Sequence, residues 1–391
     1  MSEAGLEGRV ARPRRLALAV LLGAFGAFGL FAGTFAVLLA DLSNALDLTP
    51  GPLGFALFVG AAASILAMAS LGWTADRLGR RVFLVISGGV MGGGIAALAF
   101  ADGYAALLLA LIVLDAAAGL YDVGINAAAV DLEKATGRRV MSVLHAAFSA
   151  GGVVGAISSG ALLSSGVDYR HVYLGVLLPL GMVILAVATV RLPPPGAPPE
   201  NQVGDERAGL YRNLPLLLIA MIATLALLSE GEMEHWSGVY LRGTLGLSAL
   251  LGASGVAVFY GAMTVGRLGA AFVIARFGNR LTLGAAGLLA AGGMILALAT
   301  REASLVIAGF LVVGLALSAV VPIAFSAAGD LAPERAGAAL SVVTTLGYGG
   351  FLLGPVLVGG LAEVLGLRAA LGIVAVSGFL IFALALRLKA A

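Results

Sequence analysis

Twelve stretches of about 20 residues run through this chain almost without charge, and they restrict its fold more than any other feature. An α-helix of this length crosses the hydrocarbon core of a bilayer. Charged residues make up only 11% of the 391 residues, whereas about a quarter of the residues in a soluble domain are charged. Since lipid offers no hydrogen bonds, each spanning stretch must satisfy its own backbone as a helix. The sequence therefore predicts an all-α, polytopic membrane protein with 12 transmembrane helices.

The predicted spans form two groups of six, separated by a proline-rich segment. The first group lies near 16–40, 53–71, 82–101, 104–130, 141–165 and 171–190, and the second near 214–240, 250–275, 281–300, 304–329, 338–361 and 369–387. The intervening segment holds five prolines among polar residues, which is typical of an extended linker. We predict an N-terminal half over 1–191, a linker over 192–213 and a C-terminal half over 214–391.

The two halves also repeat one another. Residues 77–81 (Arg-Leu-Gly-Arg-Arg) recur 199 positions later as residues 276–280 (Arg-Phe-Gly-Asn-Arg). The same offset relates the pairs Asp131 and Asp330, Ser142 and Ser341, Gly151 and Gly350, and Gly155 and Gly354. One offset that holds across several segments indicates two pseudo-symmetric halves related by parallel repetition. The second copy lacks the acid of the first, because Ala275 stands at the place of Asp76.

The cations predict the orientation of the chain. With the N-terminus in the cytoplasm, 18 of the 23 Lys and Arg residues fall on the cytoplasmic side, four fall on the opposite side and Arg267 lies within a span. This bias follows the positive-inside rule and places both termini in the cytoplasm. The segment before residue 16 is basic, and no small-residue cleavage site follows the first apolar run. We therefore interpret the segment as a retained tail. The Ala, Gly and Arg bias suggests a bacterial inner-membrane protein.

Acidic side chains lie inside two of the predicted spans, where charge is costly and marks functional positions. Asp115 and Asp122 share a helix face in the fourth span, and Asn126 continues that face. Burial favours the neutral form of a carboxyl, which suits a group that loads and releases a proton near neutral pH. The alternative is an acid that locks two helices together by a hydrogen bond.

Three further groups in the spans are candidates. His145 and Ser149 share a face of the fifth span, as a proton relay or as packing and gating residues. The seventh span ends in the run 229–237, in which Glu230 and Glu234 share a face and Glu232 points elsewhere. Gly231 is a candidate helix break at a cavity. Trp236 is either an interfacial anchor, which its position favours slightly, or a stacking platform for a ring.

The hydrophilic turn at 72–81 reads Gly-Trp-Thr-Ala-Asp-Arg-Leu-Gly-Arg-Arg. This pattern resembles the loop between helices 2 and 3 of the major facilitator superfamily of secondary transporters. The resemblance implies two six-helix halves around a central cavity lined by spans 1, 4, 7 and 10, with alternating access. It also implies a cytoplasmic gate closed by charge pairing of this loop with the facing half and with a helix end. The gating residues would be Gly72, Asp76, Arg77, Gly79, Arg80 and Arg81.

Further motifs extend the resemblance over the whole chain, toward a bacterial branch distantly similar to the fucose–proton symporters. They are Asp122-x-x-x-Asn126, Asp131-x-Glu133, His145-x-x-x-Ser149, Glu230-Gly231 with Trp236, and Thr344-Thr345-x-Gly347-Tyr348. In the fucose symporters a span-4 acid four residues before an asparagine is protonated during transport, and Asp122 holds that place. Those symporters also use an acid in span 1, whereas this chain has only Asp41, at the end of that span. Sugar specificity therefore does not follow.

These observations select the candidate residues. The proton-coupling candidates are Asp122, Asp115, Glu230 and His145, and the substrate-binding candidates are Asp122, Asn126, Ser149, Glu230, Glu234, Trp236 and Tyr348. The function expected first is proton-coupled import of a small polar, sugar-like solute. Efflux antiport of amphipathic compounds and a non-transporting membrane sensor remain the alternatives.

Other function classes find no support in the sequence. The chain has no cysteine and no metal-ligand spacing, so we expect no metal and no cofactor. No nucleophile–base set indicates an enzyme, and no phosphate-binding loop indicates ATP-driven transport. A net charge of +2 argues against a nucleic-acid partner. The expected partners are the solute, protons and the lipid bilayer, with the chain as a monomer.

Overall fold

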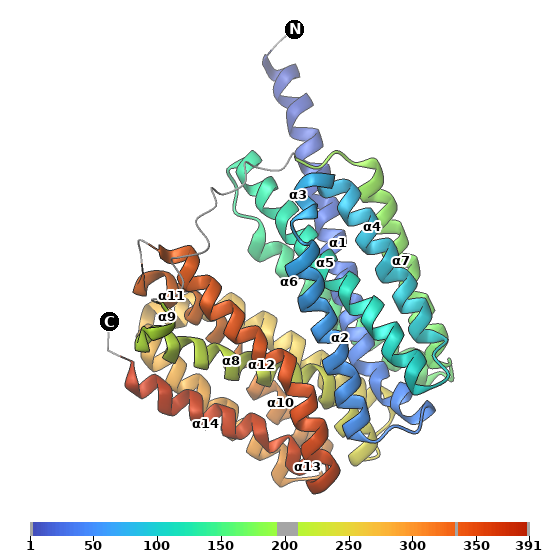
Figure 1. Cartoon of the computed structure of the whole chain (residues 1–391), viewed down its shortest axis with the longest axis vertical. Coiled ribbons are helices and arrows are strands. Elements are labelled where there is room, and N and C mark those ends of the chain that lie inside the picture. Colours follow the sequence, from blue (N-terminus) through green and yellow to red (C-terminus); the bar gives the residue numbers. More distant parts are fainter. Residues whose placement is uncertain (1–2, 194–209, 333–334, 389–391) are drawn as a thin grey trace. The chain divides into compact units, whose positions relative to one another are not determined.

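The structure is a computed structural model that describes residues 3–193, 210–332 and 335–388 (Figure 1). Every regular element in these ranges is helical. Most of the predicted linker, together with Lys389, lies outside them. Internal contacts divide the chain into two units: Met1–Leu46 with Val59–Pro198, and Asp47–Phe58 with Pro199–Ala391. Residues 47–58 thus group with the second unit, although the predicted division at the linker placed them in the first half.

The first unit is a helix bundle. Its helices are α1 (Glu3–Ala45), α3 (Thr74–Leu78), α4 (Arg80–Ala99), α5 (Tyr104–Thr136), α6 (Met141–Ser164) and α7 (Tyr169–Thr189). Helix α2 (Pro50–Leu71) contributes its part from residue 59 onward. Helix α1 packs on α6 and α7, and α4 packs on α5 and α7; Figure 1 shows α4 and α7 side by side.

The second unit is also helical. It contains a short 3₁₀ turn at Leu210–Arg212, α8 (Leu214–Val239), a π-helical turn at Tyr240–Thr244 and α9 (Ala249–Ala299). These are followed by α10 (Ala303–Leu317), α11 (Val320–Leu331), α12 (Ala336–Leu365), α13 (Leu367–Ala370) and α14 (Gly372–Arg387). Helix α8 packs on α12 and α14, and α9 packs on α10 and α14.

Eleven helical segments in the described ranges are long and apolar enough to cross a membrane. The longest, α9, has 51 residues and would extend ~76 Å if straight, over twice the thickness of a bilayer core. It is two spans joined at Gly278, whose φ of 74° breaks the helical geometry. The twelve spans predicted from the sequence are therefore present.

Glycines bring the backbones of α1 and α6 together. A Cβ on Gly29 or Gly33 of α1 would overlap the backbone of Phe148 or Gly152 of α6, and Gly155 of α6 lies equally close to Leu30. Close approach of this kind is how helices pack in lipid. The absence of side chains at these positions therefore lets the first and fifth spans pack closely.

Glycines related by the 199-residue offset allow close helix packing in both units. A Cβ on Gly151 of α6 would overlap the carbonyl oxygen of Gly26, and one on Gly350 of α12 would overlap that of Thr224 in α8. The α1–α6 and α8–α12 pairs are thus built on equivalent glycines 199 residues apart. This repetition at the level of contacts supports the parallel repeat inferred from the sequence.

One local expectation was wrong. Helix α8 continues through Gly231 without a break, because the missing side chain makes room for the ring of Phe351, 3.1 Å from where a Cβ would lie. The N-terminal segment, interpreted as a retained tail, forms the first turns of α1, which begins at Glu3.

Candidate functional site

A buried charge cluster fixes the turn between α2 and α4. Arg80 Nη1 lies 2.6 Å from Asp76 Oδ1, and Arg80 Nε donates to Asp131 Oδ2 of α5 at 2.7 Å. Arg80 and Asp131 are 8% and 4% exposed, whereas the side chain of Asp76 is half exposed. A buried arginine needs such partners, because an uncompensated charge there is costly. The cluster ties α3 and α4 to α5 within the first unit, and the pairing of the loop with the facing half stays a prediction.

The remaining predicted gating residues surround this cluster. Gly79 has a φ of 77°, a conformation that favours glycine, and it joins α3 to α4. Gly72 closes α2, where a Cβ would lie 2.5 Å from the carbonyl oxygen of Met68. Arg77 is exposed, with its guanidinium 5.0 Å from the ring centre of Trp73, and Arg81 is exposed as well. The two arginines therefore point away from the buried cluster.

Asp115 and Asp122 lie in the middle of α5, and neither forms an ion pair with a cation among the described residues. Asn126 Nδ2 donates to both the backbone oxygen and Oδ1 of Asp122, each at 2.9 Å. The carboxyl of Asp115 lies directly against Gly60 of α2, where a Cβ would overlap it. Both acids are half-buried. The two acids are thus held by an amide and by close helix packing, and not by a cation.

Helix α6 places the predicted His145 and Ser149 in different surroundings. The His145 ring is exposed and meets Phe25 of α1 edge-on, with ring centres 5.3 Å apart. Ser149 is 2% exposed, and its hydroxyl donates to the backbone oxygen of His145 at 3.2 Å. The hydroxyl of Ser149 is thus satisfied by its own helix, which leaves His145 as the accessible group of the pair.

Helices α8 and α9 bring together a polar cluster inside the second unit. Arg267 Nη2 lies 3.6 Å from Glu230 Oε2, an ion pair longer than a hydrogen bond. Glu234 is hydrogen-bonded to Tyr260 and interacts electrostatically with Arg267 and Glu230. We call Glu230, Glu234, Tyr260 and Arg267 the α8–α9 cluster. It combines two acids, one cation and one hydroxyl, a set able to bind a polar solute from several sides.

Sequence reasoning missed Tyr260 and Arg267. A signal for Arg267 was present, because it is the one cation that the sequence places within a span, and such a charge requires a counter-ion. Tyr260 lies seven residues earlier, on the same face of α9. Glu230 and Glu234 share one face of α8. Pairing that acidic face with the face of α9 that holds the arginine would have identified both missed residues.

The other residues of α8 point elsewhere. Glu232 is fully buried against Gly354 of α12, and neither of its oxygens has a hydrogen-bond partner among the described residues. Trp236 is also fully buried, so the interfacial-anchor interpretation is wrong: its helix turns the indole into the unit. Tyr348 of α12 is 44% exposed. Contact of Trp236 or Tyr348 with a solute stays a prediction.

Comparison with known proteins decides the family. The family model described as Major Facilitator Superfamily matches residues 16–300 and 255–390. An uncharacterized MFS-type transporter of Yersinia pestis is 33% identical over 352 residues, 90% of each chain. This chain belongs to the major facilitator superfamily. The resemblance seen in the sequence is thereby confirmed.

Other members and solved structures agree with this placement. The membrane protein MosC of Rhizobium meliloti is 29% identical over 366 residues, 93% of this chain and 88% of its own. A mutant of the nucleoside transporter NupG has a TM-score of 0.82 at 16% identity, covering 96% of this chain and all of its own. A bacterial homolog of the human lysosomal transporter Spinster, inward-facing and occupied, has a TM-score of 0.79 at 16% identity, over 96% of each chain. At such identities the two structures show the superfamily fold alone.

Proposed function

We propose that this membrane transporter imports a small polar solute together with protons across the bacterial inner membrane. The observation that carries the proposal is the excess of acids over cations inside the spans. Within the predicted spans 104–130, 214–240 and 250–275 there are five acids but one arginine; the six residues are Asp115, Asp122, Glu230, Glu232, Glu234 and Arg267. A carboxylate without a cation is costly in an apolar interior, which favours its neutral form. Acids that gain a proton on one side and lose it on the other couple transport to the proton gradient.

Asp122 is the proton carrier in this proposal, with Asp115 beside it on the same helix. Asn126 lies ready to stabilise the charged state of Asp122, because its amide already donates to the carboxyl at 2.9 Å. A hydrogen bond to the charged form favours that form. The pair can therefore hold a proton when closed to water and release it when water enters. His145, exposed on α6, is a secondary relay.

The α8–α9 cluster is the proposed solute site. The two carboxyls accept hydrogen bonds, Tyr260 offers a hydroxyl, and Arg267 donates from a planar group. Hydroxyl-rich neutral solutes, such as sugars and nucleosides, present donors and acceptors that match this set. The nucleoside transporter NupG shares the fold, and nucleosides therefore belong among the solutes to be tested.

The Asp76–Arg80–Asp131 cluster, in which Arg80 and Asp131 are buried, is the proposed latch of the cytoplasmic gate. It holds the loop rigid against α5, so that the loop moves together with the first unit during alternating access. In this proposal both termini lie in the cytoplasm and the protein works as a monomer.

Proteoliposomes with a pH-sensitive dye trapped inside test the proposal. Pools of sugars, nucleosides, organic acids and amphipathic cations are added outside in turn. Symport predicts acidification of the interior with one pool, which Asp122→Asn abolishes. The matched control is Asp102→Asn, which changes an exposed carboxyl before α5 and should leave the signal intact.

The other outcomes separate the alternatives. Interior alkalinisation would mean antiport and contradict import by symport. The absence of both proton movement and solute flux with every pool would favour a sensor.

A further inference from the structure

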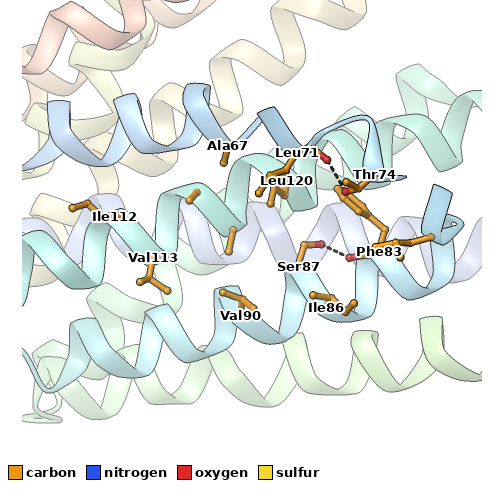
Figure 2. Close-up of a pocket in the computed structure, with 13 residues that line it drawn as sticks. Ala67, Leu71, Thr74, Phe83, Ile86, Ser87, Val90, Ile112, Val113 and Leu120 are labelled. Atoms are coloured by element: carbon orange, nitrogen blue, oxygen red, sulfur yellow. Dashed lines mark hydrogen bonds between the residues drawn. The ribbon is translucent and has the colours of Figure 1, made fainter. Parts of the chain in front are cut away.

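The first unit carries an apolar groove that the proposed transport does not use. Its volume is about 420 Å³, and residues of α2, α3, α4 and α5 line it. Figure 2 shows Thr74 and Phe83 toward one end, and Ile112 and Val113 at the other. The groove thus begins at the charged loop and follows the helices away from it.

The lining offers almost nothing but hydrocarbon. The two hydroxyls are satisfied within their own segments: Thr74 donates to the Leu71 oxygen at 2.6 Å and Ser87 to the Phe83 oxygen at 2.8 Å, as drawn in Figure 2. Ile86 and Val113 are each about half exposed along the wall. A groove without unsatisfied polar groups favours an apolar occupant, such as an acyl chain.

The loop end of the groove is cationic. Arg80 is occupied by Asp76 and Asp131, whereas Arg77 and Arg81 are exposed. Within the described part of the chain no acidic side chain forms an ion pair with Arg77 or Arg81. Two exposed arginines in the loop that contributes Thr74 and Leu78 to the groove are complementary to an anionic lipid headgroup joined to its chain.

An exposed tryptophan marks the same end. Trp73 is 54% exposed, and its indole N–H donates to the Ser70 oxygen at 2.8 Å. Tryptophan in this setting lies at headgroup level in membrane proteins. From Arg81 to Val90 the helix rises ~14 Å, about half of a bilayer core. The groove therefore has the depth of one leaflet.

We propose that this groove binds one acyl chain of an anionic phospholipid, with its phosphate held by Arg77 and Arg81. Binding would attach the loop at residues 72–81 to the anionic leaflet, so that lipid composition would affect how firmly the loop is held there. The proposal does not depend on proton coupling or on the identity of the solute.

Tryptophan quenching by brominated lipids tests the site in the full chain, reconstituted in liposomes. The chain has two tryptophans, and Trp236 is fully buried, so quenching reports mainly on Trp73. Quenching by brominated phosphatidylglycerol is compared with quenching by brominated phosphatidylethanolamine at equal mole fraction. We expect phosphatidylglycerol to be preferred, with a relative binding constant larger by about fivefold for each arginine.

Paired variants locate the preference. The double variant Arg77→Gln/Arg81→Gln should bind both lipids equally. Its matched control, Arg276→Gln/Arg280→Gln, removes the same charge from the repeated loop and should keep the preference. Taking the ratio of the two lipids within each variant cancels any change in the fluorescence of Trp73 itself.

A groove variant keeps the test decisive if the arginine variants fold poorly. Ala116→Phe fills the groove and leaves the arginines in place, so quenching by phosphatidylglycerol should fall toward that by phosphatidylethanolamine. Equal quenching by both lipids in the natural chain would overturn the proposal. So would a preference that survives either the double arginine variant or Ala116→Phe.

Discussion

The two units share the glycines that form their turns and close helix contacts, but they differ in where their charged residues lie. Gly79 and Gly278, 199 residues apart, have φ of 77° and 74°, each at a turn between two spans. In the first unit the loop holds the buried Arg80–Asp131 pair. In the second, Asn279 replaces the arginine, Asp330 is exposed, and the charges lie instead in the α8–α9 cluster.

This contrast separates the fold from its use. Glycines that occur at equivalent positions in both units are needed by the helix packing and the turns, so they serve the architecture. Charges found in one unit only are not required by that architecture, and each has an energetic cost in an apolar interior. This contrast supports the proposal that the loop of the first unit acts as the gate latch, that α5 transfers protons and that the α8–α9 cluster binds the solute.

The largest expected effect comes from removing Asp131, the buried acid of α5 that pairs with Arg80 of the loop. Asp131→Asn leaves Arg80 with the half-exposed Asp76 alone, and should lower the free energy of unfolding by about 3 kcal/mol. Unfolding in mixed detergent micelles, followed by circular dichroism, measures it. Asp330→Asn is the matched control, and should change stability by less than about 0.5 kcal/mol because Asp330 is exposed. Equal losses in the two variants would remove the contrast between the loops.

A smaller and equal effect is expected at the shared glycines. No atom lies within 4 Å of a Cβ built on Gly79 or Gly278, so the cost of Gly79→Ala and Gly278→Ala is backbone strain alone. Each variant should lose about 1–3 kcal/mol of stability in the same unfolding assay. A loss in only one variant would show that the two turns are not equivalent.

The ion pair of the α8–α9 cluster should contribute less. A double-mutant cycle with Glu230→Gln and Arg267→Gln is expected to give a coupling of about 1 kcal/mol, because Arg267 is partly exposed and lies 3.6 Å from the carboxylate. The control cycle pairs Arg267→Gln with Glu232→Gln. It should show no coupling, since Glu232 faces α12. Coupling in the control alone would contradict the cluster as described.

The smallest effect should follow from copying the acid and the arginine into the second loop. The double variant Ala275→Asp/Asn279→Arg recreates the spacing of Asp76 and Arg80. Residues 275 and 279 flank the turn at Gly278, and an exposed ion pair there should stabilise the chain by only about 0.5 kcal/mol. A gain above about 2 kcal/mol would mean that Asp330 becomes buried with the new arginine, and that charge alone makes the latch.

Much of the fold could be predicted from the sequence, because apolar runs and repeated glycines are local signals. Gly151 and Gly350, which the sequence relates by the 199-residue offset, both lie where two helices pack closely. The break at Gly231 was not a safe inference, since a missing Cβ serves equally to admit the Phe351 ring of another helix. Nothing local distinguishes the two uses.

The candidate site was less accessible to sequence reasoning. The faces of α5 and α8 followed from helical spacing, which set Asp122 with Asn126 and Glu230 with Glu234. The partners Tyr260 and Arg267 depend on which helix lies opposite, and spacing along one helix does not give that. Trp236 shows the same limit: its place near a helix end did not tell whether the ring faces lipid or protein.

A comparison of solute accumulation with solute exchange in the Asp122→Asn variant tests proton coupling most directly. With a solute found in the dye assay, proteoliposomes measure uphill uptake driven by an imposed pH gradient and, separately, counterflow between equal proton concentrations. The variant should lose pH-driven accumulation and keep counterflow, because a neutral amide resembles the protonated acid but cannot release a proton. Accumulation that persists in Asp122→Asn, with unchanged pH dependence, would contradict Asp122 as the proton carrier.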